Sequence, residues 1–137
     1  MTIKGNQHGP FAQALRAGVL AGASGERNRA AILEVLVEAG ADLSTSTGLP
    51  IRLVCSPSAI DTPECAIVLV CDGQRKVNPL PLCYFRLPVT GMATITPLRP
   101  GEKPIDVPDA DAMAGALREI LSDPAVAILV VKYLEFR

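Results

Sequence analysis

The chain has 137 residues and a mass of 14.4 kDa, enough for one domain with a buried core. Apolar residues make up 49% of the sequence and the mean hydropathy is +0.31, which excludes a disordered chain. Thirteen basic residues nearly cancel fourteen acidic ones, and aromatic residues make up only 4%. Nucleic-acid binding is therefore not expected as the main role, because such proteins use a basic surface or aromatic stacking platforms.

Apolar runs such as Val126–Val131 are far shorter than the roughly 18 residues that a membrane-spanning helix needs. The first ten residues, MTIKGNQHGP, contain one lysine and no apolar block, so we predict no secretory signal. We therefore expect the protein in a cytoplasm, or in a particle that is assembled in one.

Two helices are predicted in the first third of the chain. Residues 1–9 are polar and predict a tail before a single α+β domain over residues 10–137. Pro10 can begin a helix, but glycines recur after it, so a short helix followed by a loop is expected. Apolar residues at helical spacing predict a second helix over about residues 27–39, with Gly40 as its C-terminal cap.

Three strands are predicted after a polar loop at residues 44–50. The first covers residues 51–56. The second, ECAIVLVCDG at residues 64–73, reads as the central strand of the sheet, buried on both faces, and its Asp-Gly ending is a hairpin signal. Alternation and β-branched residues predict one long strand over residues 82–96, which Pro88 interrupts.

A helix and a final strand close the predicted domain. Residues 97–108 form a proline-rich surface connection, and Asp109 is a good N-cap for a helix over about residues 110–121. The sequence VAILVVKYLEFR then predicts a last strand. The predicted order is α-α-β-β-β-α-β, a mainly antiparallel sheet of about four strands with two or three helices packed on one face.

Catalytic motifs are not found in the sequence. There is no GxGxxG, no P-loop and no G-x-S-x-G, and the single histidine, His8, lies in the polar tail. Three loop carboxylates, Asp61, Glu64 and Asp72, could meet at one end of the sheet and carry out acid–base chemistry or hold Mg²⁺. Ordinary turn chemistry also explains Asp61 and Asp72. We assign no catalytic, cofactor-binding or metal-binding residue.

The four cysteines form no C-x-x-C pair; they are Cys55, Cys65, Cys71 and Cys83. Three of them lie inside apolar runs, where cysteine behaves as a small hydrophobic residue. We predict buried structural thiols, with a disulfide or a metal site as the alternatives.

The predicted order of elements over residues 28–137 resembles the small tail-terminator and head–tail joining proteins of tailed bacteriophages. TPECAIVLVCDG resembles the central strand of that family, and ALREILSDPAVAILVVKYLEFR resembles its closing helix and strand. The resemblance implies a ring, typically a hexamer, in which sheets of neighbouring subunits pair, and it implies no catalytic residues. Four cysteines and a tail before Pro10 depart from the family pattern.

We therefore expect a structural virion protein, a ring-forming tail terminator or head–tail connector component that contacts copies of itself and neighbouring structural proteins. No membrane partner is expected. The alternative is a small cytoplasmic protein-binding module such as a chaperone, an adaptor or an immunity protein. A third possibility is a metal-dependent enzyme that uses the loop carboxylates.

Overall fold

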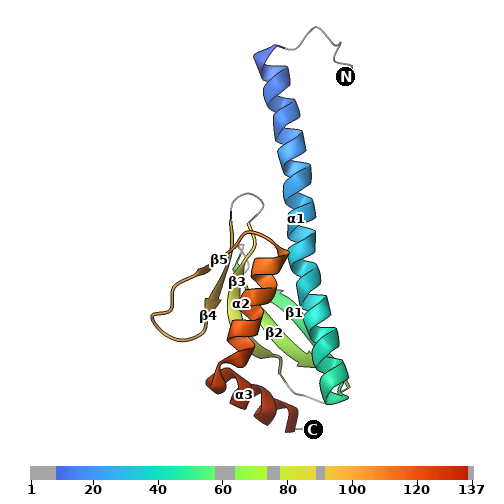
Figure 1. Cartoon of the computed structure of the whole chain (residues 1–137), viewed down its shortest axis with the longest axis vertical. Helices are drawn as coiled ribbons and strands as arrows, with labels where there is room; N and C mark the ends of the chain where they lie inside the picture. Colours follow the sequence, from blue (N-terminus) through green and yellow to red (C-terminus); the bar gives the residue numbers. More distant parts are fainter. Residues whose placement is uncertain (1–8, 58–63, 74–77, 89–91, 136–137) are drawn as a thin grey trace.

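The computed structural model describes residues 9–57, 64–73, 78–88 and 92–135. A long helix, α1 (Pro10–Thr47), precedes five strands and two shorter helices (Figure 1). The strands are β1 (Ile51–Pro57), β2 (Glu64–Cys71), β3 (Leu80–Arg86), β4 (Ala93–Pro97) and β5 (Ile105–Val107), and the helices are α2 (Ala110–Ser122) and α3 (Pro124–Glu135). The fold is α+β with an antiparallel sheet, as predicted. Its order, α-β-β-β-β-β-α-α, differs from the predicted order.

The two helices predicted before β1 are one continuous helix. Gly18, Gly22 and Gly25 lie within α1 and do not end it, although each glycine costs roughly 1 kcal/mol relative to alanine in a helix. The helix also includes residues 44–47 of the loop predicted at residues 44–50, and in its last turn the Thr47 hydroxyl donates to the Leu43 carbonyl at 2.8 Å. It ends at Gly48, whose positive φ of 72° is a conformation that favours glycine.

Gly40 has a different role from the predicted helix cap. It lies inside α1, where the helix crosses the backbone of β1. A Cβ atom at this position would lie 3.0 Å from the Leu53 amide nitrogen and 3.3 Å from the Arg52 Cα. Glycine is therefore needed here for close packing of the helix on the strand, and not to end the helix.

The sheet is a meander in which each strand pairs antiparallel with the next, in the order β1-β2-β3-β4-β5. The predicted strands at residues 51–56 and 64–73 correspond to β1 and β2. Three consecutive residues of β2, Ile67, Val68 and Leu69, are buried, which confirms that this strand is covered on both faces there. It lies inside the sheet between β1 and β3, but β3 occupies the middle position.

The prediction of one long third strand over residues 82–96 is wrong, because this segment contains two antiparallel strands, β3 and β4. Phe85 of β3 pairs with Ile95 of β4, and Pro88 follows the end of β3. Proline has no N–H to give to the ladder, so a turn there is more favourable than a continued strand. The predicted surface connection at residues 97–108 contains β5, in which Ile105 pairs with Ile95.

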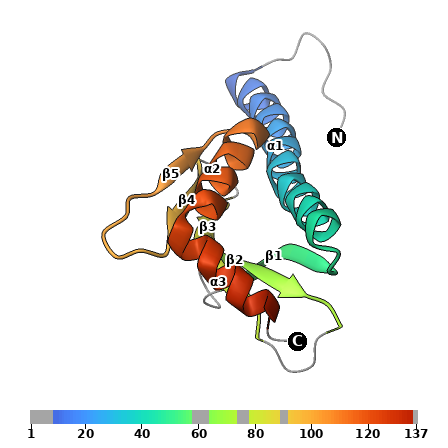
Figure 2. The same ribbon diagram turned by 60° about the horizontal axis from the view of Figure 1, so that its bottom comes forward.

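The helices pack on one face of the sheet around a single core, as predicted (Figure 2). In that view α2 and α3 lie in front of the strands and α1 lies beside α2. The core joins Ile32 and Leu36 of α1 with Phe85 of β3 and Met113 of α2. The predicted N-cap of α2 is confirmed, since the Asp109 carboxylate accepts a hydrogen bond from the Ala112 amide at 2.8 Å.

The final segment is the helix α3 and not the predicted strand. Asp123 caps it: its carboxylate accepts from the Ala125 amide at 2.9 Å, and its carbonyl accepts from the Ala127 amide at 2.9 Å. Pro124 supplies a first helical residue whose φ is already fixed near the helical value. These two residues begin a helix in a sequence whose apolar, β-branched content favours a strand.

Candidate functional site

Of the three loop carboxylates, only Asp72 has a side chain that the structure describes. Asp72 follows β2 and accepts two hydrogen bonds from the Arg52 guanidinium of β1, at 2.6 and 2.8 Å. The hydrogen bond from Arg52 lowers the pKa of Asp72, and the same bond raises the pKa of Arg52. Asp61 lies outside the described residues, as does the side chain of Glu64, which begins β2. Within the described ranges, no three or more His, Cys, Asp or Glu residues are grouped so that they could hold a metal ion.

The four cysteines are free thiols. Cys71 and Cys83 are buried, whereas Cys55 and Cys65 are half-buried. Burial raises the pKa of Cys55 and of Cys83 to about 12, and it also raises the pKa of Cys65. These three thiols are therefore protonated at neutral pH and poor nucleophiles, which agrees with the predicted structural role. His8 lies outside the described residues.

The most unusual surface is the N-terminal part of α1, residues 10–25, which we call the arm. It extends beyond the sheet and the other two helices (Figure 1), and at a rise of 1.5 Å per residue it is about 24 Å long. Every residue from 13 to 24 is exposed. Four large apolar side chains stand out on it, between 61% and 89% exposed: Phe11, Leu15, Val19 and Leu20.

Polar contacts mark the place where α1 leaves the domain. The Asn28 side chain donates to the Pro108 carbonyl at 2.9 Å, and the Arg29 guanidinium donates to the Leu87 carbonyl at 3.5 Å. The first fully buried side chain of the helix, Ile32, follows one turn later. Among the hydrogen bonds of the described residues, those that join this part of α1 to the rest of the domain therefore lie at the C-terminal end of the arm.

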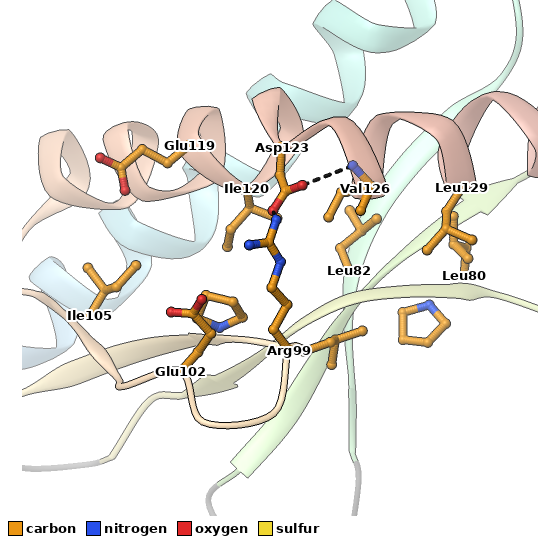
Figure 3. Close-up of a pocket in the computed structure, with 14 residues that line it drawn as sticks. Leu80, Leu82, Arg99, Glu102, Ile105, Glu119, Ile120, Asp123, Val126 and Leu129 are labelled. Atoms are coloured by element: carbon orange, nitrogen blue, oxygen red, sulfur yellow. Dashed lines mark hydrogen bonds and ion pairs between the residues drawn. The ribbon is translucent and has the colours of Figure 1, made fainter.

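A second feature lies at the other end of the molecule, where α3 meets the sheet. A pocket of about 360 Å³ opens between β3, the end of β4 and the junction of α2 with α3 (Figure 3). We call it the α3 pocket. Its wall is mainly apolar and includes Leu80, Leu82, Leu98, Ile120, Val126 and Leu129.

Charged groups line one side of the α3 pocket. Arg99 reaches from the β4–β5 connection to Asp123 and forms an ion pair with it (Figure 3). Glu102 and Glu119 lie on the side of this pair toward Ile105, whereas Val126 and Leu129 lie on the other side. Neither glutamate takes part in an ion pair within the described ranges. With Arg99 and Asp123 neutralising each other, the pocket keeps an excess of two negative charges.

Helix α3 adds further apolar surface beside the pocket. Its residues are apolar on all sides, yet none is fully buried. Ile128, Leu129 and Val131 are each more than half exposed. A helix that is mainly apolar is normally buried, so the exposed side of α3 is unusual for a surface helix.

Sequence reasoning found the arm's spacing but missed its exposure. The spacing of Phe11, Leu15 and Val19 predicts a short helix but does not indicate which of its sides is exposed. The feature of the sequence that could have singled out this segment is its low charge content, since Arg16 is the only charged residue between Pro10 and Gly25. The α3 pocket could not be predicted, because its walls require the β3–β4 hairpin and a C-terminal helix.

No family model, curated protein or solved structure matches this chain. None of the described helices is both long enough and apolar enough to cross a membrane. The geometry of the chain itself is therefore the basis for a functional proposal. What it offers is two apolar surfaces suited to contact with protein.

Proposed function

We propose that this protein is a structural assembly protein that associates with copies of itself through the arm. The observation that carries the proposal is the exposure of Phe11, Leu15, Val19 and Leu20 on a helix that projects from the domain. Burying a large apolar side chain is worth about 1.5–3 kcal/mol. Four of them on one projecting helix favour association, and contiguous exposed apolar surface is typical of interaction sites.

The more specific form of the proposal is a ring-forming tail terminator or head–tail connector component of a tailed bacteriophage. The order of elements on which the resemblance mainly rested differs from the order in the structure. The remaining support is the likeness of the β2 segment to the central strand of that family, together with an antiparallel sheet that carries its helices on one face. The closing strand on which that resemblance also relied is α3, so sheet pairing through a C-terminal strand is not part of the proposal. In this form, helices make the contacts between subunits.

A small protein-binding module is the second candidate, and the α3 pocket favours it. An apolar pocket of about 360 Å³ with a few charged groups could hold the side chains of a different protein. In that case the chain would be a monomer until its partner is added.

Size-exclusion chromatography with light scattering tests the proposal. We expect the wild-type protein to form an oligomer whose mass depends on concentration, and Leu15→Glu to be a monomer. The matched control is Val37→Glu, because Leu15 and Val37 are both on α1 and are both 61% exposed, but Val37 lies outside the arm. A wild-type protein that stays monomeric at high concentration would contradict self-assembly and favour the binding module.

A further inference from the structure

We infer that the arm of one copy docks into the α3 pocket of a second copy, in a contact that pairs two different surfaces of the chain. The inference rests on the proposed self-assembly and names the site at which it occurs. Three features of the structure support it: the position of the two surfaces, their apolar character and their charges.

The arm cannot reach the α3 pocket of its own chain. The arm leaves the domain at one end of the molecule, and α3 lies at the other end (Figure 1). Residues 28 and 29 hold α1 to the domain in between, through Pro108 and Leu87. A contact between the arm and the α3 pocket therefore has to join two copies.

The apolar parts of the two surfaces match in size and kind. Phe11, Leu15 and Val19 are spaced four residues apart, so they project from neighbouring turns of one side of the helix. On the pocket side, Leu80, Val126 and Leu129 line the part away from the glutamates (Figure 3). A volume of about 360 Å³ is enough for more than one large side chain of the arm.

The charges of the two surfaces are complementary. Arg16 is the only charged residue of the arm, and it follows Leu15 directly in the sequence. The pocket has Glu102 and Glu119 in excess over its Arg99–Asp123 pair. In the docked state, Arg16 would face the acidic side of the pocket while the apolar side chains of the arm fill its apolar side. This arrangement favours one orientation of the docked helix.

A contact between two different surfaces can continue from copy to copy. Each docked chain still offers its own α3 pocket to a further arm, so the association closes as a ring or as a reciprocal pair, or it grows as a filament. Contacts made by helices could therefore build the ring of subunits that the more specific form of the proposed function requires.

Two pairs of variants test the docking by light scattering. We expect Leu15→Glu on the arm and Leu129→Glu in the pocket each to give a monomer. The matched control for the pocket is Ile128→Glu, since Ile128 is 55% exposed and Leu129 is 52% exposed on the same helix, but only Leu129 lines the pocket. Ile128→Glu should keep the oligomer, as should Val37→Glu. Circular dichroism checks that each variant is folded.

A charge exchange provides a test that loss of folding cannot imitate. Arg16→Glu and Glu119→Arg should each weaken association by about five- to tenfold, because each replaces an attraction by a repulsion at a partly exposed pair. Combining the two substitutions should restore most of the wild-type association.

The possible outcomes separate the docking site from the self-assembly. If Leu15→Glu is a monomer while Leu129→Glu keeps the wild-type mass and the charge exchange gives no recovery, the arm assembles elsewhere and the inference is wrong, although the proposed function stands. If the wild-type protein is itself a monomer, both fail. Loss of the oligomer in Leu15→Glu and Leu129→Glu, with recovery in the exchanged pair, supports the inference.

Discussion

At the scale of single residues, the Arg52–Asp72 pair links the start of β1 to the turn after β2. The guanidinium donates two hydrogen bonds to the carboxylate, at 2.6 and 2.8 Å. Both side chains are exposed to solvent, so the contribution of the pair is screened and modest. Its main consequence is that it ties the Asp72 carboxylate to Arg52 of the neighbouring strand.

The pair predicts a pH dependence of stability. Because the pKa of Asp72 is lowered in the folded protein, its stabilising effect is present above the unfolded value of 3.8 and is lost as the pH falls through the folded pKa. We expect the melting temperature of Asp72→Asn to lie below that of the wild type by a constant amount between neutral pH and about pH 5. The difference should shrink below about pH 4. Asp106→Asn, an exposed position on β5 outside any described ion pair, is the control. A difference that persists unchanged into acid would rule out the ion pair as its source.

At the scale of elements, the packing of α1 on β1 depends on Gly40. The added methyl group of Gly40→Ala would press on the backbone of Arg52 and Leu53 at 3.0–3.3 Å. Backbone atoms in a paired strand cannot rotate away as a flexible side chain can. We expect Gly40→Ala to lower the free energy of unfolding by about 1 kcal/mol or more, because overpacking outweighs the gain in helix propensity.

Gly115→Ala is the matched control for this prediction. Gly115 is also inside a helix, α2, but a Cβ atom there would have no neighbour within 4 Å. This variant should raise the free energy of unfolding by about 0.5–1 kcal/mol, the usual effect of replacing glycine by alanine in a helix. Urea denaturation measures both variants, and equal stabilisation of the two would show that α1 and β1 do not pack as closely as described.

The elements that sequence reasoning predicted correctly were those with a local signal of their own. Asp109 capped α2 as expected, and the apolar run of β2 was an interior strand. The errors arose where two local signals competed. The apolar, β-branched residues after Val126 favour a strand, but Asp123 and Pro124 begin a helix, and a helix start of this kind is readable from sequence.

Other features could not be read from the chain because they depend on distant contacts. β5 has three residues, and it is a strand because β4 lies beside it. Gly40 resembled a helix end, and only the crossing of β1 explains why α1 continues through it. The α3 pocket combines the start of β3, the end of β4 and two helices. The candidate site was therefore not predictable, although the apolar spacing of the arm was visible.

At the scale of the whole molecule, exposed apolar surface is concentrated at two ends. The arm carries four large apolar side chains at one end, and α3 carries Ile128, Leu129 and Val131 at the other. The buried residues of the core begin at Ile32 and end at Ile120, and α3 packs against this core through half-buried side chains, among them Val126 and Tyr133. None of the residues that form or contact the core, among those the structure describes, belongs to the arm. The domain therefore does not need the arm for its own folding, and assembly accounts for the exposed apolar side chains of the arm better than stability does.

Association through an arm that lies outside the core predicts that the melting temperature depends on protein concentration. If copies associate through the arm only when folded, association stabilises the folded state by mass action, and the melting temperature of the wild type should rise by roughly a few degrees for each tenfold increase in concentration. Leu15→Glu should melt at one temperature across the same range, close to the wild-type value in the dilute limit, because the core lies outside the arm. Differential scanning calorimetry over a concentration series measures both. A wild-type melting temperature that is independent of concentration and equal to that of Leu15→Glu would contradict the association of folded copies through the arm.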